Sequence, residues 1–173
     1  MSTSNKTPRR IKNYMFVREK KNDDLEWIRA ERVVSDNMPR PIVLCNGVFD
    51  LLHPGHLRIL FQARDLGKTL IVAMDSDRRV KELKGPLRPI MNWVERATYL
   101  QYMPIDLLCE IDSDEEMNEL IQRVRPDIRV QGAEYLATRS RYPWLRKAYV
   151  RMGNIKTSDI INRIIERYNN ETP

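Results

Sequence analysis

The sequence predicts an α/β domain built on a mostly parallel sheet of about five strands. Short apolar runs typical of buried strands alternate with segments whose apolar residues recur at helical spacing, which favours parallel strands joined by helices. Hydrophobic residues make up 42% of the 173 residues, which suits one domain with a full core. The two cysteines lie in apolar runs and no Cys/His group has zinc-ligand spacing, so we expect buried thiols, no disulfide and no protein-held metal.

Basic residues gather at the beginning of the chain. Residues 1–21 contain seven Lys and Arg and a single Glu, which accounts for the whole formal charge of +6. We expect residues 1–39 to be a basic, partly flexible N-terminal extension, with a short amphipathic helix over 22–38, and residues 40–173 to be the domain. Nucleic acid is expected as a partner only through this extension, and a solvated tail is the equal alternative. Because we see no membrane-spanning run and no signal peptide, we expect a cytoplasmic protein.

Each element of the domain has its own signal. A buried-strand run at 42–45 ends at Asn46-Gly47, and Gly67 is placed to end the helix that follows. We expect strands at 42–45, 69–74, 106–111, 128–131 and 148–151, and helices at 55–66, 77–83, 92–102, 114–124 and 157–168. Such sheets bind ligands beyond the carboxyl ends of their strands. The segments to search are therefore 46–56, 75–77, 84–96, 131–135 and 151–158.

The segment from Asn46 to His56 is the most informative of these. It reads Asn-Gly-Val-Phe-Asp-Leu-Leu-His-Pro-Gly-His and holds both histidines of the chain, His53 and His56, on either side of Gly55. Amides at a helix N-terminus attract anions, glycine lets a phosphate approach the backbone, and imidazoles can donate hydrogen bonds to phosphate oxygens. Both imidazoles also have ordinary pKa values near physiological pH. The pattern predicts a cradle for a polyphosphate, and the alternative is a turn with a helix cap.

This segment resembles the signature of the cytidylyltransferase-like nucleotidyltransferases, Gly-x-Phe-Asp-x-x-His-x-Gly-His. Every fixed position is met, by Gly47, Phe49, Asp50, His53, Gly55 and His56. The resemblance covers residues 40–168 and implies a Rossmann-like three-layer fold. The full string between a strand and a helix is highly specific.

Three later segments continue the resemblance. Residues 83–90, Leu-Lys-Gly-Pro-Leu-Arg-Pro-Ile, resemble the lysine-bearing loop in the nucleotidyltransferase domain of bacterial ADP-heptose synthases. Residues 130–135 resemble a Gly-x-Asp-aromatic segment, with Glu134 where Asp is usual. Residues 151–158 resemble a closing Arg…Ile-Ser-Thr-Thr segment, with Lys156 where a small hydroxyl residue is usual.

The resemblance implies a role for each matched residue. The expected catalytic residues are His53, His56 and Lys84, with the lysine bridging phosphates. Contacts with the nucleotide are expected from Gly47, Val48, Phe49, Asp50, Gly55, Gln131, Gly132, Glu134, Arg151, Ile155, Thr157 and Ser158. Contacts with the acceptor phosphate are expected from Arg88, Arg96 and Asp75. Asp50 is expected to support its loop, Asp75 is equally typical of a turn, and Thr157 and Ser158 are equally typical of a helix cap.

The implied reaction transfers a nucleoside monophosphate from ATP or CTP to a sugar or alditol phosphate and releases pyrophosphate. No nucleophilic Ser or Cys beside a base is visible, which favours direct attack by the acceptor phosphate. Mg²⁺ is expected to arrive with the triphosphate, held mainly by phosphate oxygens and water. A homodimer is a further implication of the resemblance.

Two alternatives stay open at this point. The lysine-bearing loop favours adenylyl transfer to a sugar 1-phosphate, as in ADP-heptose synthases, whereas Arg151 resembles glycerol-3-phosphate cytidylyltransferase, which uses CTP. The alternative from another class is a nucleotide-binding partner protein without turnover.

Overall fold

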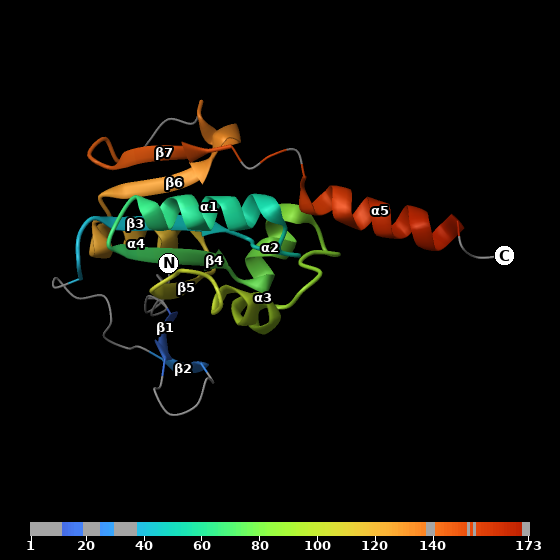
Figure 1. The fold of residues 1–173 in the computed structure, drawn as a ribbon, viewed down its shortest axis with the longest axis horizontal. Coiled ribbons are helices and arrows are strands. Elements are labelled where there is room, and N and C mark those ends of the chain that lie inside the picture. Colours follow the sequence, from blue (N-terminus) through green and yellow to red (C-terminus); the bar gives the residue numbers. More distant parts are fainter. Residues whose placement is uncertain are drawn as a thin grey trace, which may run out of the picture.

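The computed structural model describes residues 12–18, 25–29, 38–137, 141–151, 153 and 155–170, whose strands form a seven-stranded sheet (Figure 1). The order of the strands is β2-β1-β5-β4-β3-β6-β7, and β3 to β7 are all parallel. Their bounds are β3 (Ile42–Gly47), β4 (Thr69–Asp75), β5 (Leu107–Ile111), β6 (Ile128–Gly132) and β7 (Arg146–Val150). The predicted α/β fold with a mostly parallel sheet is therefore confirmed. The chain winds one way from β3 to β5 and the other way from β6, so the topological switch lies between β3 and β6.

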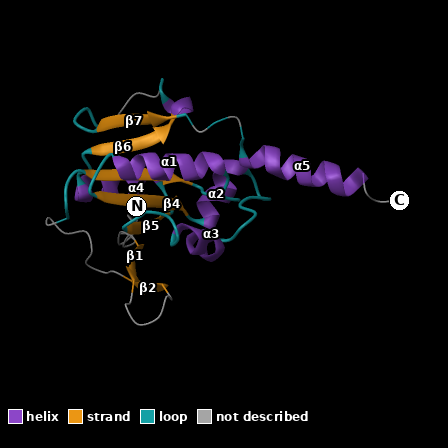
Figure 2. Ribbon diagram, viewed as in Figure 1, coloured by secondary structure: helices purple, strands orange, loops and turns teal. Residues whose placement is uncertain are grey.

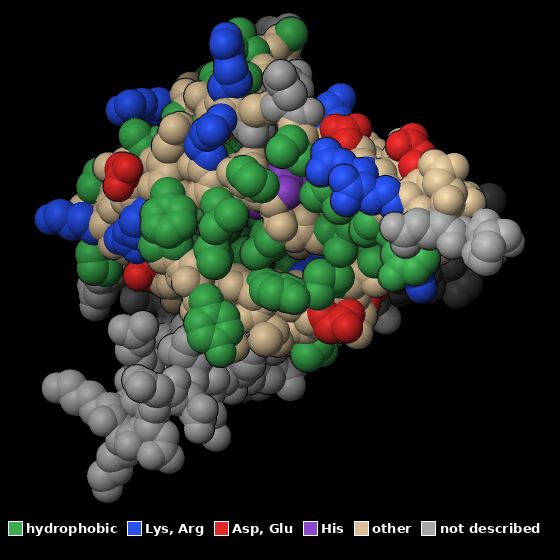
Figure 3. All heavy atoms as spheres, turned by 45° about the vertical axis from the view of Figure 1, so that its right-hand side comes forward, with side chains coloured by type: hydrophobic (Ala, Val, Ile, Leu, Met, Phe, Trp, Pro, Cys, Tyr) green, Lys and Arg blue, Asp and Glu red, His purple; other side chains and the backbone are tan. Residues whose placement is uncertain are grey.

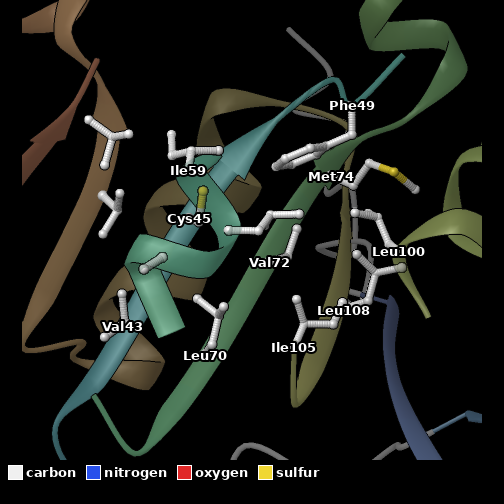
Figure 4. Close-up of a cluster of buried hydrophobic side chains, with 14 of the residues drawn as sticks. Val43, Cys45, Phe49, Ile59, Leu70, Val72, Met74, Leu100, Ile105 and Leu108 are labelled. Carbon is white, nitrogen blue, oxygen red and sulfur yellow. The ribbon is translucent and has the colours of Figure 1, made fainter. Parts of the chain in front are cut away.

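Helices cover both faces of this sheet, except for the last helix, which extends away from it (Figure 2). They are α1 (Pro54–Asp65), α2 (Asp77–Lys84), α3 (Trp93–Leu100), α4 (Asp114–Val124) and α5 (Thr157–Asn170), with a 3₁₀ turn η1 at Ala133–Tyr135. One core packs α1 and α3 against the sheet, and a second core packs α4 against the opposite face. Figure 4 shows the first core, in which Cys45 of β3 lies beside Ile59 of α1 and Val43 lies further along the same strand. Leu44, between those two residues in β3, belongs to the second core, as strand alternation requires.

Close packing at the amino ends of the strands explains why glycine stands at position 67, where a helix was predicted to end. Gly67 follows α1, and a Cβ atom there would lie 2.4 Å from the Pro41 carbonyl oxygen. Only glycine fits this approach, and the next amide, of Lys68, donates to the same carbonyl at 2.9 Å. The turn therefore leads the chain directly from α1 into β4, beside β3.

The helix expected over residues 22–38 is wrong for the part that the structure describes. Residues Leu25–Arg29 form strand β2, which pairs antiparallel with β1 (Lys12–Arg18), and β1 pairs antiparallel with β5. Without β1, the backbone groups along one side of β5 would lack strand partners, and pairing at such an edge outweighs a weak local helix pattern. The rest of the expected helix, and the predicted flexibility of residues 1–11, lie outside the described residues.

The last helix, α5, extends away from the body of the domain (Figure 1). Its N-terminus adjoins the turn between β3 and α1, where the Thr157 hydroxyl donates to the Asp50 carbonyl oxygen at 3.0 Å. None of its described residues is buried, and Ile164 and Ile165 remain about half exposed. No helix in the described part of the chain is long and apolar enough to cross a membrane.

Candidate active site

The turn between β3 and α1 is tightly wound at the carboxyl end of the sheet. Phe49 and Leu51 both have left-handed backbone conformations, with φ angles of 54° and 47°. The Phe49 side chain is 3% exposed and belongs to the core between the sheet and α1. Burial of this ring stabilises a backbone shape that non-glycine residues rarely adopt. The turn brings Asp50 and His53 to the start of α1.

The two histidine rings face each other at the N-terminus of α1. Their centroids are 3.9 Å apart, and their planes are inclined by 32°. His53 is the N-cap residue, and its Nδ1 accepts a hydrogen bond from the Gly55 amide at 3.1 Å. Since Nδ1 accepts, the proton of a neutral His53 lies on Nε2. The observed cap uses Nδ1, and the predicted phosphate contact would use Nε2 of the same ring, so the two interpretations of His53 are compatible.

Both imidazoles are held in the neutral form. Burial lowers the pKa of His53, an effect that the nearby Asp159 opposes. Burial, together with repulsion from His53, lowers the pKa of His56 to about 4, although Asp50 opposes this. The ordinary pKa of an imidazole would let both rings carry charge near physiological pH, whereas in this fold the lowered pKa values favour the neutral form. The rings present neutral N–H donors, and the buried Nδ1 of His56 has no hydrogen-bond partner among the described residues.

Asp50 fixes the loop that precedes α3. Its fully buried carboxylate accepts hydrogen bonds from Arg88 Nε at 2.7 Å and from the amides of Ile90 and Met91 at 2.9 and 3.0 Å. The expected supporting role of Asp50 therefore has a concrete form, which is to hold a loop of another segment. Because Nε carries the contact with Asp50, the Nη groups of Arg88 can still donate to an anion.

Arg96 is placed differently from its expected role. Its side chain is fully buried, with Nη1 donating to the Val48 carbonyl at 2.5 Å and Nη2 donating to the Asp75 carbonyl at 2.9 Å and to Asp77 at 2.7 Å. These contacts connect the ends of β3 and β4 to α3 and give Arg96 a positioning role in the fold. Contact with an acceptor phosphate would need the guanidinium to leave these partners, and it stays a prediction.

The Asp75 carboxylate is likewise engaged with the protein. It accepts a hydrogen bond from Arg79 Nε at 2.8 Å, and burial raises its pKa. The predicted contact of Asp75 with the acceptor remains untested, and its position at the end of β4 is also that of a turn residue.

A second helix N-terminus approaches the same turn. Besides the contact of Thr157 with Asp50, the Lys156 amide donates to the Asp159 carboxylate at 2.8 Å, so Asp159 closes the first turn of α5. Thr157 is the first residue of α5 and its hydroxyl donates to the turn, and Ser158 beside it is exposed. The first amides of α1 and α5 both favour anions near the turn.

The remaining predicted residues lie at the ends of other elements or in the segment before α5. Lys84 ends α2, is exposed, and has no ion-pair partner among the described residues. Gln131 and Gly132 end β6, and the Gln131 Oε1 atom is buried without a hydrogen-bond partner in the described structure. The side chain of Glu134 is not among those that the structure describes. Arg151 and Ile155 precede α5, and both are exposed.

One residue near the site was missed by the sequence reasoning. Arg58, on the second turn of α1, donates from Nη1 to the Arg151 carbonyl at 3.4 Å. Its guanidinium is also the nearest group to a Cβ placed on Gly153, at 3.5 Å. Arg58 therefore connects α1 to the segment before α5. The sequence signal that could have identified Arg58 as a site residue is its position two residues after His56.

Figure 3 shows the surface over this region. An imidazole is visible between hydrophobic side chains, with a group of Lys and Arg side chains close by. The described residues contain no group of three or more His, Cys, Asp or Glu side chains that could hold a metal ion. The arrangement offers amide, imidazole and guanidinium donors, which is the chemistry of an anion site.

The comparisons with known proteins identify the family of this chain. Residues 44–163 match the family model described as "Cytidylyltransferase-like". Over 108 residues, 62% of this chain, it is 44% identical to "Bifunctional protein HldE" from Campylobacter curvus, and over 151 residues, 83% of this chain, it is 36% identical to the protein of that name from Syntrophotalea carbinolica. The matches cover 23% and 31% of those relatives, so the chain spans less than a third of their length.

A solved structure is also similar. It is titled "Crystal structure of the lipopolysaccharide core biosynthesis protein from Thermoplasma volcanium GSS1" and matches with a TM-score of 0.46 and 21% identity over 72% of this chain and 86% of that one. The family assignment depends on the family model, which matches more than half of the chain. The chain belongs to the cytidylyltransferase-like family.

Proposed function

We propose that this protein is a nucleotidyltransferase that transfers a nucleoside monophosphate from a nucleoside triphosphate to a sugar phosphate. The observation that carries this proposal is the facing pair of neutral imidazoles where the N-termini of α1 and α5 meet. Such a site places several N–H donors around one anion without burying a fixed positive charge. Membership of the cytidylyltransferase-like family supports the same chemistry.

The reaction is a direct displacement at the α-phosphorus. A phosphate oxygen of the acceptor forms the new P–O bond, the bond between the α-phosphorus and the bridging oxygen breaks, and pyrophosphate leaves with that oxygen. Nε2–H of His53 and the ring of His56 stabilise charge on the transferred group and the leaving group. Lys84, at the end of α2, supplies a mobile cation for the phosphates, and Arg88 binds the acceptor.

Magnesium enters this proposal with the triphosphate. The carboxylates of Asp50, Asp75 and Asp77 all accept hydrogen bonds from arginines of the protein. The described residues therefore fit an ion held mainly by phosphate oxygens and water, where it neutralises phosphate charge. No protein ligand needs to be assigned to it.

The preferred substrates are ATP and a sugar 1-phosphate. The relatives named HldE and the Leu-Lys-Gly-Pro loop before Arg88 support this choice. CTP with an alditol phosphate is the second candidate, favoured by the position of Arg151 before α5. The homodimer and the cytoplasmic location implied by the sequence remain predictions.

The test is pyrophosphate release with ATP or CTP across a panel of sugar and alditol phosphates. His53→Ala and His56→Ala should each lower the rate by about 10²–10³-fold, as expected for a lost transition-state donor. Gln62→Ala, an exposed position on α1, is the matched control and should keep the wild-type rate. Full activity in a variant that lacks both imidazoles would refute the proposal. Nucleotide binding without turnover of any pair would instead indicate a non-catalytic partner protein.

A further inference from the structure

A cavity of about 400 Å³ opens at the end of the sheet opposite the histidines. Its lining residues are Arg40, Arg125, Pro126, Asp127 and Trp144. These residues lie before β3, between α4 and β6, and before β7, so they gather at the amino ends of the strands. The arrows of β6 and β7 in Figure 1 point away from this end and toward the proposed active site. The cavity is therefore separate from the nucleotide site.

The acidic group of the cavity is already neutralised. Arg40 Nη2 forms an ion pair with Asp127 Oδ1 at 2.9 Å and donates to the Arg125 carbonyl at 2.7 Å. The other carboxylate oxygen of Asp127 accepts the Ile42 amide at 2.6 Å. Because both oxygens of Asp127 are engaged, the carboxylate repels an entering anion only weakly.

Arg125, in contrast, pairs with no carboxylate in the described part of the chain. It follows α4 in a left-handed conformation, with φ 47° and ψ 60°, at a helix end where glycine or asparagine is usual. Its guanidinium carbon lies 5.8 Å from the centre of the Trp144 ring, and no described carboxylate pairs with it. Its exposed side chain thus leaves a planar cation beside the indole.

Trp144 supplies an open aromatic surface. The residue is 48% exposed, and its ring meets Tyr142 edge-on, with centroids 5.8 Å apart. The guanidinium carbon of Arg125 lies over the indole, 5.8 Å from its centre, which is within cation–π range. The exposed part of the indole offers an aromatic surface on which a flat ring can stack beside this cation.

We propose that this cavity is a second ligand site, which binds a flat aromatic compound carrying a phosphate or carboxylate. The aromatic ring stacks on Trp144, and the anion pairs with the guanidinium of Arg125. The volume is within the range of small-molecule sites. A nucleotide and an aromatic carboxylate share this chemistry, and the experiment distinguishes them.

The indole N–H signals in the ¹⁵N NMR spectrum of the full chain give a direct readout, because the sequence has only three tryptophans. Trp144→Phe assigns the relevant signal. Titration with AMP or with benzoate should shift it saturably, whereas adenosine or inorganic phosphate alone should bind roughly tenfold more weakly. A response to AMP only identifies a nucleotide site, and a response to benzoate only identifies a carboxylate site.

Variants then connect the signal to the cavity. Arg125→Gln should weaken binding roughly tenfold, Arg125→Lys should weaken it less, and Arg123→Gln, which alters an exposed arginine on the last turn of α4, should leave it unchanged. The response should persist in His53→Ala/His56→Ala, so failure of the proposed nucleotidyl transfer would not affect this test. The proposal is overturned if neither AMP nor benzoate shifts the Trp144 signal up to about 10 mM. Equal binding by folded Arg125→Gln, or by inorganic phosphate alone, would overturn it as well.

Discussion

Replacing Asp50 with asparagine is expected to lower turnover about a hundredfold. Its buried carboxylate receives three hydrogen bonds, from Arg88 and from the amides of Ile90 and Met91. Asparagine keeps the shape but turns an NH₂ group toward a donor, and breaking one side of a buried ion pair costs about 3–5 kcal/mol. Most of this cost falls on the loop of residues 88–91, and a displacement of about 1 Å in a positioning group can cost about 10²-fold in rate.

The assay is the initial rate of pyrophosphate release with the acceptor varied at saturating triphosphate, together with urea unfolding. Asp106→Asn is the matched control, because the Asp106 carboxylate also accepts from an arginine, Arg64, and from one amide, at the opposite end of the sheet. The control should lose stability and keep its rate. If Asp50 acts through Arg88, adding Asp50→Asn to Arg88→Ala should cost little more than either change alone. This role of Asp50 would be refuted if Asp50→Asn kept the wild-type kcat/KM for the acceptor. It would also be refuted if the rate losses of Asp50→Asn and Arg88→Ala multiplied fully in the double variant.

Lowering the pH from about 6.5 to 4 is expected to reduce the free energy of unfolding by on the order of 2 kcal/mol through His56. The pKa of His56 is about 4 in the folded protein and 6.5 ordinarily, so over this pH range the unfolded chain binds a proton that the folded chain does not. His56→Gln should therefore lose less stability in urea over the same range. Lys84→Met should lower the rate of pyrophosphate release without changing the melting temperature, and Lys81→Met, on the same exposed helix, should change neither. Equal rates for the two lysine variants would contradict the role of Lys84. Burial raises the pKa of Cys45 and Cys109 to about 12, so a thiol reagent should modify neither in the native protein and both in urea; rapid native labelling would show that the core opens.

The parallel core of the fold was predictable because its strands are buried on both faces. Such strands read as continuous apolar runs, and the run at 42–45 is the start of β3, with all four side chains buried. The secondary-structure prediction failed at β2, a five-residue segment for which a helix was expected and a strand is found. Its structure depends on the nearby strand β1 and, through β1, on the edge of β5, which is distant in sequence.

The position of the two histidines was predictable, whereas the contacts of Asp50 and Arg96 were not. The order of residues along the chain placed His53 and His56 at a helix N-terminus, as found. No local pattern shows that the Asp50 carboxylate holds the loop at Arg88, or that Arg96 is enclosed by carbonyl oxygens. The contacts of the Asp50 carboxylate join residues that are 38 or more positions apart in the sequence. The contacts of Arg96 with carbonyl oxygens join residues that are 21 or more positions apart.

Neutral imidazoles are compatible with a stable fold and with the proposed binding of a polyphosphate. Two buried imidazolium ions 3.9 Å apart would be costly, and the low pKa of His56 avoids that cost. A bound triphosphate brings negative charge, which raises the pKa of nearby imidazoles. Binding of ATP near pH 6 should therefore take up protons at His56.

Titration calorimetry in buffers of different ionisation enthalpy measures this uptake. His56→Gln is the reference, because protons released by the triphosphate itself contribute equally to both proteins. Wild-type protein should take up more protons than the variant, and the difference should shrink as the pH rises above about 7. Identical proton counts for the two proteins at pH 6 would mean that the phosphates do not approach His56, and the placement of the triphosphate at the N-terminus of α1 would then be wrong.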